Sequence, residues 1–177
     1  MRWLWVAVGV FIAMPAGARE ARDYKASEQS IVNCIEAAEK ALLQTGVDIT
    51  RQCIGIETRN CDQTTEDAYQ SNKRMYCASA EAEVWSRLME AAFATLITRY
   101  SAWDAEGGKK QTSVEYEPVV PALRQAHEAW EQRKDCEFAR IQPGQGTDKY
   151  DVPARCGRDQ VADRALLYRR WLTRQPY

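Results

Sequence analysis

The 177-residue sequence contains a single histidine, His127, and no Cys-x-x-Cys spacing among its six cysteines. Zinc sites need cysteine and histidine ligands at short, regular spacings, so we expect no metal. A histidine that acts as a general base needs a nucleophile beside it, and no serine or cysteine motif accompanies His127. The sequence therefore predicts no catalytic residues and no cofactor, and His127 is interpreted as an ordinary helix residue.

Two further sequence patterns could indicate a catalytic or a phosphate-binding site, and both lack the neighbouring residues that such a site needs. Paired carboxylates such as Glu36 with Glu39 and Glu115 with Glu117 could serve glycoside hydrolysis. Glutamate-rich helices normally present solvated faces, so a glycosidase is the least favoured function. The run 107–110 (GGKK) lacks the G-x-x-x-x-G-K frame of a phosphate-binding loop and is interpreted as a helix-breaking loop with a charged tip.

An excess of charge of either sign is also missing, since 24 Lys and Arg face 25 Asp and Glu. Nucleic-acid partners favour a basic surface, and a polybasic membrane surface needs a similar excess. We therefore expect no nucleic-acid partner and no membrane contact in the mature form, and the charge balance does not identify any other partner. The oligomeric state is not predicted.

Signals for β-strands are absent, because no segment alternates strictly and β-branched residues are sparse. Helical periodicity predicts an all-α fold, a disulfide-stapled antiparallel bundle of about four helices in a single domain over residues 19–177. The expected helices cover about 28–44, 64–103, 118 or 121 to 141, and 158–172. A loop carrying two cysteines is expected between the first two. Core positions are predicted for Trp85, Trp103 and Trp130, with Trp130 largely buried against the long helix.

The first 18 residues have the pattern of an export signal. Arg2 supplies the positive start, residues 3–14 are uncharged and apolar, and Ala16-Gly17-Ala18 is a small-residue cleavage pattern. The mature protein should begin at Arg19 and be periplasmic or secreted. In such compartments cysteines form disulfides, so all six are expected to be paired.

The first four cysteines have two favoured pairings. If the first two helices are antiparallel, Cys34 and Cys77 lie at roughly 14 and 18 Å from the connecting loop, which are similar heights. This predicts Cys34–Cys77, with Cys53–Cys61 closing the loop. The main alternative is Cys34–Cys53 with Cys61–Cys77.

The last two cysteines, Cys136 and Cys156, flank a segment rich in proline and glycine. Their pairing closes a loop of about 20 residues, which would stabilise the fold by roughly 3 kcal/mol on the chain-entropy model. We therefore predict a Cys136–Cys156 disulfide.

Two stretches of the sequence carry a family resemblance over roughly residues 50–170. The first is CIG at 53–55 followed by Cys61, Cys77 and ExxxWxxL at 81–88; the second is LRxAxxAW at 123–130, KDC at 134–136, Cys156 and ADR at 162–164. Together they resemble the LprI-like lysozyme-inhibitor N-terminal domain family of small exported bacterial proteins. The resemblance implies a helical, non-enzymatic exported binding module that inhibits lysozyme-type enzymes. The alternative is a structural or adaptor protein of the bacterial cell envelope.

The connection from Asp104 to Glu117 is the best candidate for contact with such a partner. Lysozyme-type enzymes work through two carboxylates in a cleft, and a loop that enters the cleft must satisfy those buried acids. Charge and hydroxyl groups for this purpose come from Lys109, Lys110, Ser113 and Tyr116.

Overall fold

The computed structural model describes residues 20, 23–67, 69–106, 117–141, 146 and 148–173; the predicted export signal lies outside this range. Within it the fold is all-α and no strand occurs, which confirms the predicted class. No helix of the described chain is long and apolar enough to cross a membrane. The elements are α1 (Glu28–Thr45), the 3-10 helix η2 (Thr50–Cys53), α2 (Ile56–Thr64), α3 (Gln70–Ala105), α4 (Val119–Glu131), α5 (Asp135–Ile141) and α6 (Asp148–Thr173).

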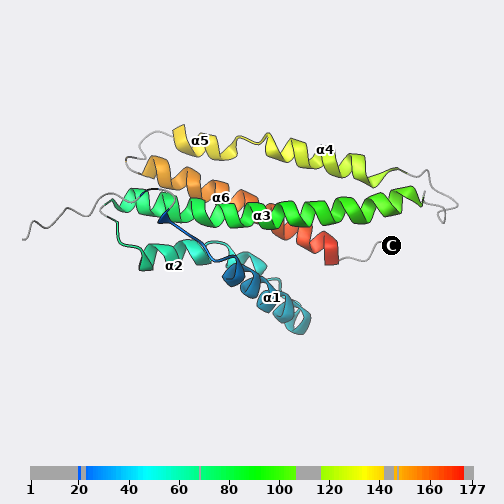
Figure 1. Cartoon of the computed structure of the whole chain (residues 1–177), viewed down its shortest axis with the longest axis horizontal. Helices are drawn as coiled ribbons and strands as arrows, with labels where there is room; N and C mark the ends of the chain where they lie inside the picture. The colour runs from blue at the N-terminus through cyan, green and yellow to red at the C-terminus, as the bar shows by residue number, and fades with distance from the viewer. Residues whose placement is uncertain are drawn as a thin grey trace, which may run out of the picture.

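The two longest helices, α3 and α6, lie side by side and run in the same direction (Figure 1). Near their starts Arg74 lies 3.9 Å from Asp151, and near their ends Arg99 donates to the carbonyl of Leu172 at 2.6 Å. In an antiparallel bundle each helix runs opposite to the next along the chain, so the second and fourth predicted helices also run in the same direction, and this pair does not test the predicted arrangement. The chain returns between these two helices through α4 and α5.

The core lies where α1 and α4 cover the α3–α6 pair. Figure 1 shows α4 and α5 on one side of the pair and α1 and α2 on the other. From α1, Ile31, Ile35 and Ala38 point into the core at the spacing of a helical stripe. The same core cluster contains Trp85 of α3 and Tyr168 of α6, both of which have no exposed surface.

The chain between the first two predicted helices is itself helical, because it contains η2 and α2. The long helix therefore starts at Gln70 rather than near Thr64. Thr64 ends α2, and the carboxylate of Asp67 accepts from the Tyr69 amide at 2.8 Å and from the Tyr24 hydroxyl. Thr64 is therefore the last residue of α2 and does not open α3.

The last two predicted helices also have different bounds. The third divides into α4 and α5 at a turn in which the Arg133 amide donates to the Trp130 carbonyl at 3.1 Å. The fourth starts ten residues before Arg158, at Asp148, although Pro153 lies inside it and removes one backbone donor. Buried Asp151, 3.1 Å from Arg155, helps to hold this early part of α6 in place.

Three disulfides staple the helices, and no described cysteine is free. The Cys136–Cys156 bridge forms as predicted, with a Cα–Cα distance of 5.4 Å. The favoured pairing of the first four cysteines is wrong, and its alternative is present: Cys34–Cys53 and Cys61–Cys77. The height comparison failed because α2 intervenes between α1 and α3. It carries Cys61 onto α3, while η2 carries Cys53 beneath α1.

The three tryptophans that were assigned to the core differ in burial. Trp85 has no exposed surface, whereas Trp103 and Trp130 are half-buried. The expectation that Trp130 is largely buried is therefore too strong. One face of its ring is covered by the guanidinium of Arg164, whose central carbon lies 5.6 Å from the ring centroid.

Candidate protein-binding site

Glu81 is a fully buried carboxylate that joins α2 to α3. One oxygen accepts from the Gly55 amide at 2.6 Å and from Trp85 Nε1 at 2.9 Å. The other accepts from the amide and the hydroxyl of Thr58, at 2.6 and 2.7 Å. Arg158 of α6 in turn donates to the Thr58 hydroxyl at 2.9 Å. With four donors, this carboxylate holds three helices together and has the environment of a structural residue rather than an acid–base group.

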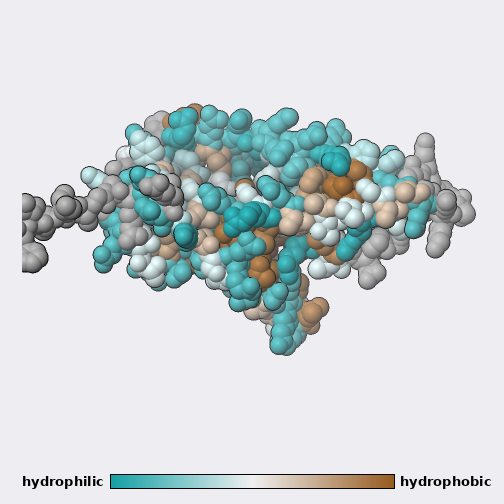
Figure 2. Space-filling view, in the orientation of Figure 1, coloured by the Kyte–Doolittle hydropathy of each residue, from teal (hydrophilic) through white to brown (hydrophobic). Residues whose placement is uncertain are grey.

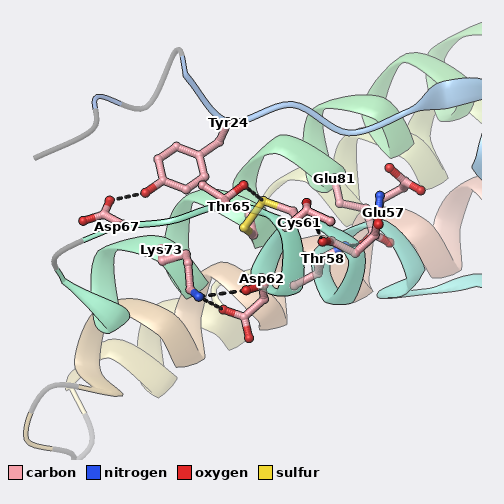
Figure 3. The surroundings of a disulfide bond; sticks show 12 residues. Tyr24, Glu57, Thr58, Cys61, Asp62, Thr65, Asp67, Lys73 and Glu81 are labelled. Carbon is pink, nitrogen blue, oxygen red and sulfur yellow. Dashed lines mark hydrogen bonds and ion pairs between the residues drawn. A yellow bond between two sulfur atoms is a disulfide. The ribbon is translucent and has the colours of Figure 1, made fainter. Parts of the chain in front are cut away.

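Gly55 makes this arrangement possible. Its φ of +83° is strained for any residue with a side chain, and a Cβ there would lie 3.2 Å from the Arg158 guanidinium. Figure 3 shows Thr58 and Glu81 close to the Cys61–Cys77 bridge. We call Gly55, Thr58, Glu81, Trp85 and Arg158 the Glu81 cluster.

The chain that leads into α1 is fixed to the same end of the molecule. The Ser27 amide donates to Glu57 of α2 at 2.8 Å, and Lys73 Nζ donates to the Asp62 carbonyl at 2.7 Å. Figure 3 shows Lys73 directed at Asp62, and the Tyr24 hydroxyl directed at Asp67. These contacts satisfy groups that are buried or half-buried, so they too are structural.

His127 belongs to a chain of contacts between α4 and α6. Arg164 Nε donates to the Tyr168 hydroxyl at 2.8 Å, and that oxygen lies 2.9 Å from His127 Nδ1. His127 Nε2 lies 3.5 Å from Glu131, and the ring stacks on Phe93 with centroids 4.0 Å apart. Burial raises the pKa of the Tyr168 hydroxyl. None of these contacts involves a serine or cysteine, and the chain orients α4 on α6.

Glu36 and Glu39 do not form an acid–base pair. Glu39 accepts two hydrogen bonds from Arg169, at 2.5 and 2.9 Å, and this contact raises the pKa of the Arg169 guanidinium. Glu36 is exposed and adds to the same effect through its charge. Glu117 is exposed, and Glu115 lies outside the described residues. The described residues also contain no group of three or more His, Cys, Asp or Glu that could hold a metal ion.

A groove of about 230 Å³ opens between α1, α3 and α6. It exists because α1 diverges from the α3–α6 pair as it approaches its C-terminal end (Figure 1). Part of the pair is therefore left uncovered by α1. Arg169 is its one charged lining residue. The groove is lined by Ile35, Trp85, Leu88, Ala91, Ala92, Thr95, Ala165, Leu166, Arg169 and Leu172. We call it the α1–α3–α6 groove.

The outer surface is mostly hydrophilic in the view of Figure 2, and hydrophobic residues gather there on α1 and where α4 runs beside α3. Leu43 of α1 is 90% exposed, the highest value among the large exposed hydrophobic residues. A leucine in this position contributes nothing to the core. It is available for contact with another molecule.

The predicted partner-binding residues Lys109, Lys110, Ser113 and Tyr116 lie outside the described residues. The structure places the two ends of that connection. The Asp104 carboxylate, at the end of α3, accepts from the amides of Val119 and Val120, each at 3.0 Å. Pro118, at the start of α4, offers no side-chain cap, so Asp104 satisfies two of the amides that a helix start leaves unpaired. The connection is therefore closed at its base.

Sequence reasoning missed the role of Glu81 and the α1–α3–α6 groove. A signal for the first was present, because Glu81 and Trp85 are four residues apart and so share one helix face. The donors from Gly55 and Thr58 gave no such signal, since they lie 26 and 23 residues before Glu81. The groove depends on the direction in which α1 runs relative to α3 and α6. The hydrophobic periodicity of the sequence carries no information about that direction.

These features define a class of protein: a helical protein stapled by three disulfides. Its buried charged groups stabilise the fold, and its accessible surfaces lie outside that buried network. The family model described as "Lysozyme inhibitor LprI" matches residues 61–166, and the chain belongs to this family. The match confirms the resemblance seen in the sequence. No curated protein and no solved structure matches the chain.

Proposed function

We propose that this protein is a non-enzymatic, exported binding module that inhibits a lysozyme-type enzyme. The observation that carries the proposal is the match of the LprI lysozyme-inhibitor model to residues 61–166. Three disulfides support export, because such bridges persist in oxidising compartments. A periplasmic or secreted location is the one in which a lysozyme would be met.

For the inhibitory contact we propose the connection from Asp104 to Glu117. Lysozyme-type enzymes hold two carboxylates in a cleft, and a cation that enters the cleft can pair with them. Lys109 and Lys110 would supply that cation. The hydrogen bonds from Val119 and Val120 to Asp104 support the proposal, because a loop with fixed ends loses less entropy on binding than an open one.

The function is tested with a turbidity assay on a cell-wall suspension, using purified protein that begins at Arg19. The proposal expects the protein to slow clearing by added c-type lysozyme and to leave the suspension unchanged when it is added alone. Clearing by the protein alone would instead identify an enzyme. No effect on lysozyme at tens of micromolar protein would leave the cell-envelope adaptor as the better account for that enzyme.

The loop is tested with the double variant Lys109→Ala/Lys110→Ala. Inhibition should weaken by about tenfold or more, which is the loss expected when a buried charge pair loses one partner. A matched control is Lys25→Ala/Lys134→Ala, which removes the same charge from exposed positions on other parts of the chain. Undiminished inhibition by the loop variant would place the inhibitory contact elsewhere.

A further inference from the structure

The three disulfides differ in how closely a solvent molecule can approach them. Both cysteines of the Cys61–Cys77 bridge are buried, with exposed fractions of 5% and 0%, and Tyr24 belongs to the same hydrophobic cluster. Both cysteines of the Cys136–Cys156 bridge are partly exposed, and neither packs in a hydrophobic cluster of the described residues. Thiol–disulfide exchange requires a thiolate to reach a sulfur atom, so access limits its rate. Cys136–Cys156 is therefore more accessible to a reductant than Cys61–Cys77.

The remaining bridge, Cys34–Cys53, has one partly exposed and one buried cysteine. Cys53 has no exposed surface and belongs to the main hydrophobic core, and Cys34 packs against that core. Attack on the Cys34 sulfur would leave the Cys53 sulfur as a thiolate in an apolar interior, where an unpaired charge is costly. Attack on either sulfur of Cys136–Cys156 leaves the thiolate at a partly exposed position, where water can solvate it. Access and solvation of the leaving thiolate thus favour the same bridge.

The helix that this bridge attaches has few other contacts to hold it. α5 has seven residues and none of them is buried. Its two large apolar residues, Phe138 and Ile141, are 65% and 61% exposed. A helix of this length is marginal in water on its own. Gln160 of α6 donates to Asp135 of α5 at 3.2 Å, but this hydrogen bond is exposed and adds little. The disulfide is therefore the main attachment of α5 to α6.

The other helices have attachments that do not involve this bridge. Glu81 holds α2 on α3 through the amides of Gly55 and Thr58, and Cys61–Cys77 joins the same two helices. α4, which precedes α5, is fixed at its start by the hydrogen bonds to Asp104 and packs through buried Leu123. Opening of the Cys136–Cys156 bridge should thus free α5 and leave the remaining helices in place.

We infer that Cys136–Cys156 is a redox latch, which a dithiol reductant opens to release α5. In the closed state the bridge holds α5 on α6. In the open state α5 detaches with Phe138 and Ile141, and the rest of the fold persists. This inference goes beyond the proposed function and does not depend on it, because it requires no binding to lysozyme.

The opening step is a thiol–disulfide exchange. One thiolate of the reductant attacks a sulfur of the bridge and forms a mixed disulfide, and the other cysteine leaves as a thiolate that takes up a proton. The second thiol of the reductant then loses its proton and attacks the mixed disulfide. The bridge thus gains two electrons and two protons to become two thiols, and the dithiol is oxidised to a disulfide.

The order of reduction is tested on oxidised protein that begins at Arg19. Dithiothreitol is the reductant, and alkylation of samples over time followed by peptide mapping gives the reduction rate of each bridge. Cys136–Cys156 should be reduced about tenfold faster than either other bridge, or more. One common rate for all three bridges would show that global unfolding controls reduction. That result, or earlier reduction of Cys34–Cys53, would overturn the inference.

The release of α5 is tested by hydrogen–deuterium exchange. After reduction of Cys136–Cys156 alone, exchange in residues 135–141 should become about tenfold faster or more, with no change in α2 or in the first half of α3. The double variant Cys136→Ser/Cys156→Ser should show the same pattern without a reductant. Unchanged exchange in α5 would show that the bridge is not a latch. Faster exchange throughout the chain would show that the bridge holds the whole fold, and would also overturn the inference.

A variant at Tyr24 tests whether access sets the order of reduction. Tyr24→Ala removes the ring that packs beside Cys61–Cys77, so reduction of that bridge should become several-fold faster. The rate for Cys136–Cys156 should stay within about twofold of the parent, because Tyr24 does not cover it. An unchanged rate for Cys61–Cys77 would contradict the argument from access.

Discussion

The two ends of the α3–α6 pair are built in different ways. At the end where both helices start, Cys61–Cys77 and Cys136–Cys156 staple the helices and the Glu81 cluster fills the interior. At the end where both helices finish, no disulfide involves α3 or α6 in the described residues, and the third bridge, Cys34–Cys53, joins α1 to η2. There the chain is held by Asp104, by the Arg99–Leu172 contact and by the His127–Tyr168 chain, and the groove remains open.

This difference teaches which residues fix the fold and which are available for binding. Buried polar groups are costly unless every donor and acceptor is paired, so a cluster such as that of Glu81 specifies one arrangement of helices. A rigid end of this kind can hold the opposite end of the α3–α6 pair in place, while the surfaces of that opposite end stay accessible. The matched family residues, 61–166, include parts of both: Glu81, Trp85 and Arg158 of the cluster, and the groove residues of α3 together with Ala165 and Leu166.

The largest expected change in the free energy of unfolding comes from replacing a tryptophan, and we compare one tryptophan from each half of the molecule. Trp85→Ala should lower the free energy of unfolding by about 4 kcal/mol, since it leaves a large cavity and removes a donor to Glu81. Trp130→Ala should cost about 1–2 kcal/mol, because its ring is already half exposed. Urea denaturation of both variants measures the difference. Equal losses would show that the two halves are fixed to the same degree.

Replacing Glu81 should have the next largest effect on the free energy of unfolding. Glu81→Gln should lower the free energy of unfolding by about 3 kcal/mol, because its amide nitrogen would face N–H donors that now meet a carboxylate. Glu83→Gln is the control, since Glu83 is exposed on the same helix, and it should stay within about 0.5 kcal/mol of the parent. A loss below about 1 kcal/mol for Glu81→Gln would contradict the role given to this cluster.

Removing each of two disulfides in turn gives a further comparison of how strongly different parts of the fold are held. The bridges Cys61–Cys77 and Cys136–Cys156 span 16 and 20 residues, so chain entropy alone gives both about 3 kcal/mol. Replacing Cys61 and Cys77 by serine should cost that amount. Replacing Cys136 and Cys156 should cost less, because α5 has no buried residue and can detach locally while the rest stays folded. Thermal unfolding of both double variants provides the measurement, and a larger loss for the second would refute this account of α5.

The smallest expected effect concerns the chain through Tyr168. Tyr168→Phe should cost about 1 kcal/mol, since Arg164 and His127 each lose one hydrogen-bond partner and can still meet water or neighbouring groups. The raised pKa of Tyr168 also has a pH consequence: its contribution to stability is complete below the unfolded pKa of about 10 and is lost as the pH rises through the folded value. Tyr168→Phe should therefore flatten the loss of stability above pH 10, measured by urea unfolding with all disulfides intact. An unchanged alkaline slope would contradict this reading of Tyr168.

The parts of the fold that the sequence predicted well have local causes. The first helix was expected over 28–44 and covers Glu28–Thr45, because Ser27 caps its start and Gly46, with φ of 73°, ends it. The end of α3 was also close to its expected position. The all-α class followed from periodicity, which depends on neighbours within one or two turns.

The parts that the sequence did not predict depend on distant residues. The segment of η2 and α2 has few apolar residues, and it is held in place by Glu81 and by its disulfides rather than by its own periodicity. The wrong cysteine pairing followed from the same omission. Of the candidate site, the loop is still a prediction that rests on its charges and glycines. The closure of its base by Asp104 joins residues 15 and 16 positions apart and could not be inferred from spacing.

The most direct test of the central claim is hydrogen–deuterium exchange of the protein alone and in complex with c-type lysozyme. The account predicts that lysozyme slows exchange in the second half of α3, over about residues 89–105, and in α6 over 165–173. Exchange in α2 and in the first half of α3 should not change. Protection confined to α2 and the start of α3, with no change at the far end, would contradict the division into a fixed end and a binding end.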